Sequence, residues 1–509
     1  MNSKDHADES ARGDSAPSRM RTGIEGLDDI LQGGLPANRV YLVEGEPGTG
    51  KTTLALQFLM EGVRLGEAGL YVTLSETKEE LEASARSHGW SLDGINIHEL
   101  APAGDTLKPE SQYTIFHPSE IELSETTGAV LEEVERINPK RVVFDSLSEM
   151  RLLAHDPLRY RRQILALKQY FIGRQCTVIL LDDKTSAVHD LQLQSIVHGV
   201  LSLEQLALEY GAERRRLRVI KLRGARFRGG YHDFNIETGG VIVFPRLVAA
   251  EHRQDFAKGF ATSDVPELDT LLGGGIARGS STLIIGPAGG GKSTLGAQFA
   301  AASASRGEKA AVFIFDEIVE TYIGRAAGIG TDIQRHVDDN LITLKQIDPA
   351  ELAPGEFAHK VLRAVGRDGV RVVVIDSLNG YLNAMPEERF LTIQMHELLT
   401  FLNQRGVVTL LVMAQHGFLG SMATPVDVSY LADTVLMLRY FEAEGAVHRA
   451  ISVIKKRTGA HEKTIRELEI TSQGIRVGEP LTKFRGVLTG VPMYGAMKNT
   501  LIEESDGNG

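Results

Sequence analysis

Short apolar runs alternate with stretches of helical period along most of the chain, and the alternation occurs twice. This pattern is typical of a mostly parallel sheet covered by helices on both faces. In the first half, the apolar runs predict strands at Val40 to Val43, Gly69 to Leu74, Arg141 to Phe144 and Thr177 to Leu181. In the second half, they predict strands at Thr282 to Ile285, Ala310 to Phe315, Arg371 to Ile375 and Val407 to Met413.

The later part of each half has a different pattern, in which β-like runs follow one another without helices between them. These runs are Leu217 to Leu222, Tyr231 to Ile236 and Gly240 to Phe244 in the first half, and Thr434 to Leu438, Ala450 to Lys455 and Thr464 to Ile470 in the second. Successive strands joined by short turns pair in antiparallel fashion. We therefore predict an α/β fold in which antiparallel strands extend each mostly parallel sheet.

The two halves are predicted to be copies of one domain. Lys51 and Lys292 are 241 residues apart, the difference between 51 and 292, and Glu76 and Glu317 keep the same offset. Unrelated tandem domains would not keep one register over such a length. We expect a disordered tail at residues 1–20, a first domain at 21–248, a second domain at 249–487 and a C-terminal tail at 488–509.

The composition narrows the classes of function. The 509 residues include 55 Lys and Arg against 67 Asp and Glu, a formal net charge of -12, which weakens any general affinity for nucleic acid or an anionic membrane. With Cys176 as its one cysteine, the chain can form no internal disulfide, which suits a reducing compartment. No signal peptide and no membrane-spanning run is recognisable, so we expect a cytoplasmic protein.

Residues 45–52 and 286–293 both fit G-x-x-x-x-G-K-[ST], the phosphate-binding P-loop pattern. Each follows an apolar run and opens a helical pattern, so that glycine N–H groups and the helix dipole can face phosphate. A Gly-rich turn before a helix is the alternative, but two copies in this setting favour nucleotide binding. The expected nucleotide-binding residues are Gly45, Gly48, Thr49, Gly50, Lys51, Thr52, Thr53, Gly286, Gly289, Gly290, Gly291, Lys292, Ser293 and Thr294.

Hydroxyl and carboxylate groups near each P-loop indicate a magnesium site. Thr52 and Ser293 supply the hydroxyl that ligates Mg²⁺ in this motif. Asp145 and Asp376 each end an apolar strand, the Walker B arrangement that binds the hydration shell of the magnesium ion. An Asp at a strand end is also a common turn residue. Its recurrence after each P-loop favours a metal role.

Glu76 and Glu317 stand just past the strand that follows each P-loop helix, where a carboxylate can reach a γ-phosphate. Activation of a water or a hydroxyl for attack requires such a base. The alternative is a solvated acid or a helix cap. Because both residues share the register of the P-loop lysines, we predict that they are catalytic, with Asp316 assisting Glu317.

Basic residues follow a late strand in both halves. Lys221 and Arg223 correspond to Lys455 and Arg457 at an offset of 234, the difference between 221 and 455. Basic residues are usually solvated, but this repeated placement suits groups that reach from one subunit into the nucleotide of the next. Such a heterologous contact implies a ring or a filament.

Together these residues resemble the KaiC family of RecA-like ATPases, whose cyanobacterial members run a circadian clock. The similarity extends from about Thr22 to Lys498 and is carried by the duplicated P-loops and by five further motifs. These motifs are Ser87 to Trp90, Glu213 to Arg216, Lys221 to Gly224, Asp433 to Thr434 and His461 to Glu467. The resemblance implies a two-tiered homohexamer with ATP between subunits, in which the first tier hydrolyses ATP slowly and the second phosphorylates itself. It also implies an autophosphatase activity and a role in timing or signalling.

The chain departs from the family pattern at identifiable positions. Ser75 and Asp316 stand where the family usually has the first of two paired glutamates. Ser429 and Tyr430 stand at the family's adjacent phosphorylated serine and threonine, and we predict Ser429 as the principal site. The resemblance implies a KaiB-like regulatory partner. The short acidic segment after Arg485 leaves a KaiA-type partner open.

Two other classes of function fit part of this pattern. RecA-like or RadA-like rings include DNA-dependent motors and recombination mediators, but these need a basic groove with stacking aromatics. With aromatics at 6% and one tryptophan, the chain argues against a nucleic-acid partner. A nucleotide-gated scaffold without turnover would not need a glutamate in each half.

Overall fold

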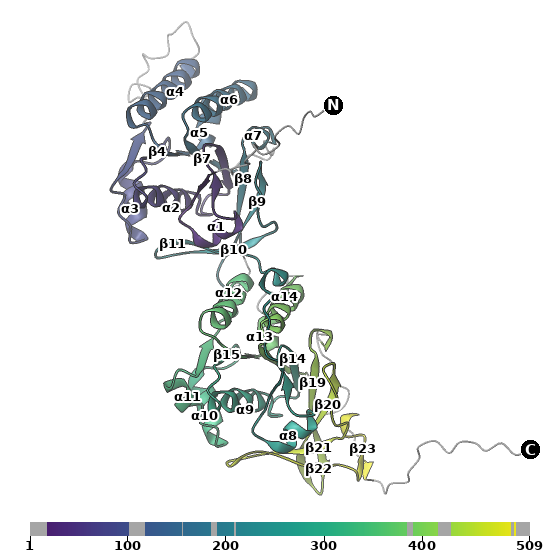
Figure 1. Cartoon of the computed structure of the whole chain (residues 1–509). Helices are drawn as coiled ribbons and strands as arrows, with labels where there is room; N and C mark the ends of the chain where they lie inside the picture. Colours follow the sequence, from purple (N-terminus) through teal and green to yellow (C-terminus); the bar gives the residue numbers. More distant parts are fainter. Residues whose placement is uncertain are drawn as a thin grey trace, which may run out of the picture. The chain divides into compact units, whose positions relative to one another are not determined.

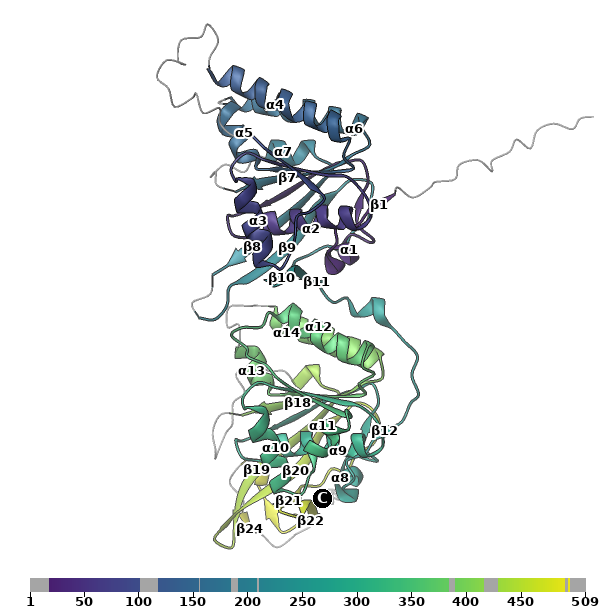
Figure 2. The same cartoon turned by 90° about the vertical axis from the view of Figure 1, so that its left-hand side faces the viewer.

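The chain folds into two compact units, Met1–Arg246 and Leu247–Gly509. The computed structural model describes residues 18–100, 118–154, 156–184, 191–207, 210–383, 390–415, 429–489 and 493–494. Figures 1 and 2 show the same layered build in both units, with a sheet between two sets of helices. None of the helices in these ranges has both the length and the apolar character needed to cross a membrane.

A nine-stranded sheet forms the centre of the first unit, in the order β11-β10-β9-β8-β3-β7-β6-β4-β5. Its strands are β3 (Val40–Gly45), β4 (Gly69–Thr73), β5 (Ile95–Glu99), β6 (Arg141–Asp145), β7 (Thr177–Asp183), β8 (Gly199–Leu206), β9 (Arg214–Leu222), β10 (His232–Glu237) and β11 (Gly240–Phe244). The six strands from β5 to β8 in this order are parallel. The last three are antiparallel.

The second unit repeats this sheet in the order β16-β15-β17-β18-β14-β19-β20-β21-β22. Its strands are β14 (Ser281–Gly286), β15 (Ala310–Ile314), β16 (Ile342–Gln346), β17 (Val372–Asp376), β18 (Val408–Ala414), β19 (Thr434–Ala443), β20 (Ala446–Lys456), β21 (Arg466–Thr471) and β22 (Gly474–Pro480). Parallel pairing again gives way to antiparallel pairing after β19. The two-stranded pairs are β1 (Arg19–Met20) with β2 (Leu35–Pro36), β12 (Phe260–Ala261) with β13 (Ile276–Ala277), and β23 (Phe484–Arg485) with β24 (Met493–Tyr494).

Helices cover both faces of each sheet. On one face of the first sheet lie α1 (Glu25–Ile30), α2 (Lys51–Arg64) and α3 (Lys78–Ser87), and on the other lie α4 (Pro118–Ile137), α5 (Leu147–Ala154), α6 (Pro157–Gly173) and α7 (Leu191–Ile196). In the second unit the corresponding sets are α8 (Pro266–Leu271), α9 (Lys292–Ser305), α10 (Val319–Gly328) and α11 (Ile333–Asp338), and then α12 (Pro354–Gly366), α13 (Leu378–Asn383) and α14 (Leu391–Gln404). Each P-loop helix, α2 or α9, therefore packs on the sheet that carries its P-loop.

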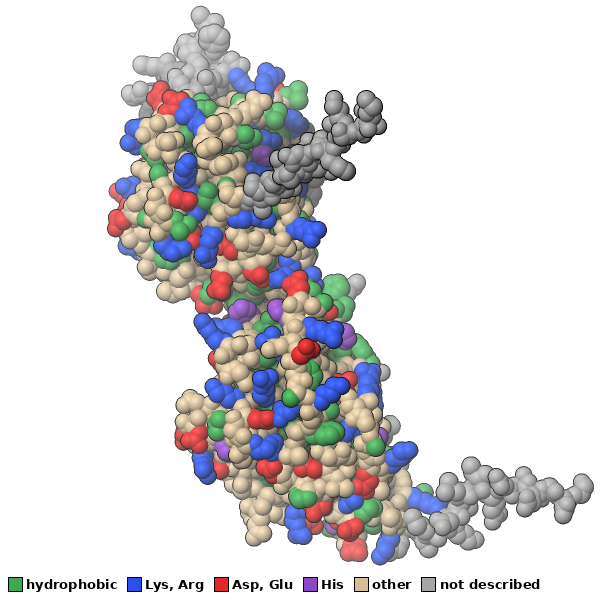
Figure 3. All heavy atoms as spheres, viewed as in Figure 1, with side chains coloured by type: hydrophobic (Ala, Val, Ile, Leu, Met, Phe, Trp, Pro, Cys, Tyr) green, Lys and Arg blue, Asp and Glu red, His purple; other side chains and the backbone are tan. Residues whose placement is uncertain are grey.

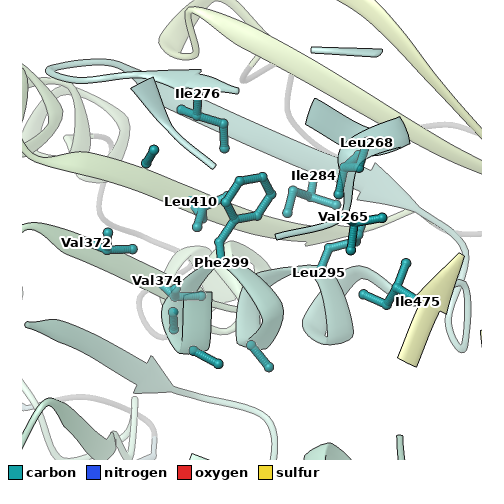
Figure 4. Close-up of a cluster of buried hydrophobic side chains, with 14 of the residues drawn as sticks. Val265, Leu268, Ile276, Ile284, Leu295, Phe299, Val372, Val374, Leu410 and Ile475 are labelled. Atoms are coloured by element: carbon teal, nitrogen blue, oxygen red, sulfur yellow. The ribbon is translucent and has the colours of Figure 1, made fainter. Parts of the chain in front are cut away.

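Apolar side chains hold these layers together. In the second unit, Leu295 and Phe299 of α9 lie against Ile284, Val374 and Leu410 of the sheet (Figure 4), all of them buried. Full burial of one such side chain stabilises a fold by about 1.5–3 kcal/mol. The P-loop is thus anchored at both ends, by a central strand and by a helix fixed to the sheet.

The predicted α/β fold with an antiparallel extension is confirmed, but the sequence pattern missed several strands. It missed β5 and β16 at the parallel edge, β8 in the first sheet and β22 at the end of the second. The side chains of β5 are half-buried or exposed, because this strand lies at the edge of the sheet. An edge strand lacks the continuous apolar run of a strand buried on both faces.

Candidate functional site

Each P-loop connects a central strand to the start of the following helix. Gly50 caps α2 with a φ of 89°, and Gly291 caps α9 with a φ of 101°, values that favour glycine. A Cβ atom on Gly291 would also lie 2.4 Å from Cδ1 of Ile470. The turn therefore requires glycine both for its backbone conformation and for space. The first N–H groups of the helix are left to face the loop.

The P-loop lysines lie over the carbonyl groups of their own loops. Lys51 Nζ donates to the carbonyl oxygens of Gly45 and Glu46, both at 2.9 Å, and Lys292 Nζ donates to that of Pro287 at 2.7 Å. Both lysines are buried. Burial lowers the pKa of Lys292, while the charges of nearby acids oppose that shift. A buried, positively charged ammonium group beside backbone amides is suited to bind the negatively charged phosphates of a nucleotide.

The hydroxyl and carboxylate expected at each magnesium site come together. Thr52 Oγ1 donates to Asp145 Oδ2 at 3.0 Å, and Tyr71 donates a second hydrogen bond to the same carboxylate. In the second unit, burial raises the pKa of Asp376 to about 6, and the interaction of its carboxylate with the Ser293 side chain opposes that shift. These side chains offer the hard oxygen ligands that Mg²⁺ prefers.

The predicted bases lie near these carboxylates, in different surroundings. Although Glu76 is exposed to solvent on one side, the protein around it and then the charge of Asp145 raise its pKa. Glu317 instead forms an ion pair with Arg325. Asp316, which was expected to assist Glu317, accepts a hydrogen bond from Ser377.

Three contacts of the site were not anticipated from the sequence. Lys51 forms an ion pair with Asp183 at 2.7 Å, Tyr71 contacts Asp145, and Arg325 contacts Glu317. Asp183 is the last residue of β7 and lies two residues beyond the predicted strand Thr177 to Leu181, and this place just after an apolar run was the available signal. Tyr71 and Arg325 gave no signal, because their types are common in strands and helices.

The four basic residues that were expected to act between subunits contact backbone carbonyl groups of their own unit in the structure. These groups lie in the segment just before β8 or β19. Arg223 donates to the carbonyl oxygen of Ser195 at 2.7 Å, and Arg457 donates to that of Tyr430 at 3.3 Å. Ser195 and Tyr430 each lie four residues before a strand, β8 or β19.

Lys221 and Lys455 likewise donate to backbone carbonyl groups, those of Gln194 and Ala432. Of the two residues expected to be phosphorylated, Tyr430 is exposed. Ser429 begins a short 3-10 helix, and its side chain lies outside the described residues.

One face of the molecule shows how its charged side chains are distributed. On the face shown in Figure 3, Lys and Arg side chains are interspersed with Asp and Glu side chains on both units. A groove that tracks a nucleic-acid strand would present an extended basic stripe.

The sequence is similar to proteins of known family. The family model for the KaiC ATPase matches residues 20–248 and 261–482. The circadian clock protein KaiC3 of Synechocystis is 27% identical over 500 residues, covering 94% of this chain and 95% of the relative. The circadian clock oscillator proteins KaiC of Synechococcus elongatus and of Prochlorococcus marinus are 27% and 28% identical, with 94% and 93% of this chain and 92% and 95% of the relatives covered.

Proposed function

Because the chain belongs to the KaiC family of ATPases, with two tandem RecA-like domains, we propose that it is a homohexameric ATPase that also phosphorylates itself. In this proposal, the first unit hydrolyses ATP and the second transfers the γ-phosphoryl group to Ser429. An autophosphatase activity of the same chain would remove the phosphate from Ser429 and restore the unphosphorylated form. The relatives are named as circadian clock proteins, so we further propose a role in timing or signalling, with a KaiB-like protein as a partner.

One observation carries the proposal. Each unit places a P-loop lysine, a hydroxyl–carboxylate pair and a glutamate at the same end of its parallel strands. Phosphoryl transfer depends on positioning and on charge neutralisation, and these groups supply both. Binding of ATP follows from membership of an ATPase family.

The two glutamates suit different nucleophiles. A raised pKa brings Glu76 closer to the range in which a carboxylate accepts a proton from water efficiently. The ion pair with Arg325 holds Glu317 in place, where we propose that it accepts the hydroxyl proton of Ser429 from the adjacent subunit. Asp316 would support Glu317 in that role.

The remaining groups would bind and orient the nucleotide. Thr52 with Asp145, and Ser293 with Asp376, would hold Mg²⁺, which supplies charge neutralisation on the phosphates when it is bound. Lys221 and Arg223 in the first unit, and Lys455 and Arg457 in the second, would reach the phosphates bound by a neighbouring subunit. This arrangement would make turnover depend on the ring.

Intact-mass spectrometry after incubation with ATP and magnesium tests the kinase part of the proposal. We expect a phosphate adduct on the wild-type chain, and none on Ser429→Ala or Glu317→Gln. Tyr430→Phe is the matched control and should keep the adduct. An adduct that survives Ser429→Ala would move the site elsewhere, and a wild-type chain without any adduct would leave an ATPase that lacks kinase activity.

A further inference from the structure

The two P-loop lysines have different partners. In the first unit, Lys51 Nζ lies 2.7 Å from Asp183 Oδ1, and 8% of the Lys51 side chain and 27% of the Asp183 side chain are exposed. The second unit has Ala414 at the corresponding position. The strand registers establish this correspondence, because Gly45 pairs with Asp183 and Gly286 pairs with Ala414.

The surrounding residues direct Asp183 toward Lys51. Asp183 is the last residue of β7, and its backbone N–H donates to Ser148 Oγ at 3.2 Å. The adjacent carboxylate, that of Asp182, forms an ion pair with Arg151, in which Asp182 Oδ2 lies 2.7 Å from Arg151 Nη2. Asp183 is therefore held at the end of its strand, while its neighbour neutralises a different cation.

This ion pair opposes nucleotide binding. The phosphates require the charge of Lys51, so Lys51 must give up Asp183 when a nucleotide binds. Asp183 would then face the phosphates without its cation, and Asp145 lies close enough for the two carboxylates to repel. Both effects favour the nucleotide-free state of the first unit.

We propose that Asp183 competes with the phosphates for Lys51 and thereby shortens the residence of the nucleotide in the first unit, whereas the second unit has Ala414, which carries no carboxylate, at the corresponding position. The inference rests on the proposed binding of nucleotide at the first P-loop, and it is independent of the kinase and timing roles. Asp183 acts through Lys51 and is not itself a catalytic residue. It makes the first unit the one that exchanges nucleotide faster.

The test measures dissociation of a fluorescent ATP analogue by stopped flow, in full-length chains whose second P-loop is disabled by Lys292→Ala. In that background, Asp183→Asn removes the charge and keeps the size of the side chain. We expect it to slow dissociation and to tighten the Kd by about tenfold, the scale of one partly screened charge. Asp183→Glu retains the charge of the carboxylate, so its Kd should stay within about twofold of that of the parent chain.

The reciprocal variant adds the competitor to the second unit. With Lys51→Ala as background, Ala414→Asp should speed dissociation and weaken the Kd by about tenfold. Thermal melting confirms that each variant is folded.

Unchanged or weaker binding in Asp183→Asn would overturn the inference, since a residue that merely orients Lys51 for phosphate would have that effect. Unchanged binding in a folded Ala414→Asp chain would also contradict it. The proposed role of the first P-loop fails in a different way, because the Lys292→Ala chain would then bind no analogue at all.

Discussion

Glu76, the proposed base of the first unit, combines solvent contact with a raised pKa, from which we predict the pH dependence of hydrolysis. The protonated carboxyl cannot accept a proton from water, so hydrolysis should fall as the pH drops through the raised pKa. Hydrolysis should therefore be lost at a higher pH than it would be with a glutamate whose pKa is not raised. Phosphate release measured against pH, in a chain with Lys292→Ala, checks this.

Glu76→Gln should lower that rate by about 100-fold or more and leave nucleotide binding intact, because it removes the base and not the phosphate cradle. Lys51→Ala is the contrasting variant, which should weaken binding itself. Hydrolysis at the parent rate in Glu76→Gln would show that another group is the base.

We predict that the buried Asp376 carboxylate lowers the stability of the second unit at neutral pH when no nucleotide is bound. Burial raises its pKa from 3.8 to about 6, so the folded chain holds this proton more tightly than the unfolded chain does. The contribution of Asp376 to stability is therefore greatest below the unfolded pKa and is lost as the pH rises through about 6, by up to about 3 kcal/mol.

Asp376→Asn should raise the free energy of unfolding at pH 7 and flatten its pH dependence, while turnover in the second unit is lost. Urea unfolding without nucleotide, at pH values below and above this window, measures the effect. Asp338→Asn, at an exposed position, should change little. A less stable Asp376→Asn chain at pH 7 would rule out this account of the buried charge.

At the scale of elements, β6 joins the P-loop helix to the sheet through a buried arginine. The Arg141 side chain is fully buried, pairs with Glu67 at 2.7 Å and donates to the carbonyl oxygens of Arg21 and Phe58. It also lies over the ring of Phe58, 4.7 Å from the ring centroid. The start of β6, the helix α2 and the segment before α1 are thereby linked.

Arg141→Met should destabilise the first unit by about 2 kcal/mol, because the carbonyl groups and Glu67 lose a charged donor. Arg371→Met is the matched control, since Arg371 is exposed at the start of the corresponding strand region. Differential scanning calorimetry should show a lower Tm for the first variant alone. If Arg141→Met had the same Tm as the parent chain, as expected for the control, the buried arginine would add no stability.

Much of the element layout follows from local sequence, and the rest depends on tertiary context. Most of the buried parallel strands, although not β8, and both P-loop helices were predicted, because apolar runs and the P-loop pattern are local signals. In contrast, β5 and β16 mix polar and apolar residues at a sheet edge. The contacts of Asp183 with Lys51 and of Arg325 with Glu317 depend on packing between distant segments, which no local pattern encodes.

At the scale of the whole molecule, the proposed ring makes assembly depend on nucleotide. A nucleotide shared between subunits binds only the assembled form and stabilises it. Light scattering after size-exclusion chromatography should show hexamers with a slowly hydrolysed ATP analogue and smaller species without it. Replacement of Arg223 and Arg457 by alanine should weaken assembly. A monomer under both conditions would remove the ring and the proposed role of these residues.

The partition of labelled γ-phosphate tests the central claim most directly. Pure protein is incubated with γ-labelled ATP and magnesium, and label is measured both as free phosphate and on the chain. The account predicts that Glu76→Gln removes most of the free phosphate and retains protein-bound label, whereas Glu317→Gln removes the protein-bound label and retains free phosphate. Equal loss of both signals in both variants would contradict the division between the two units, as would turnover that requires single-stranded DNA.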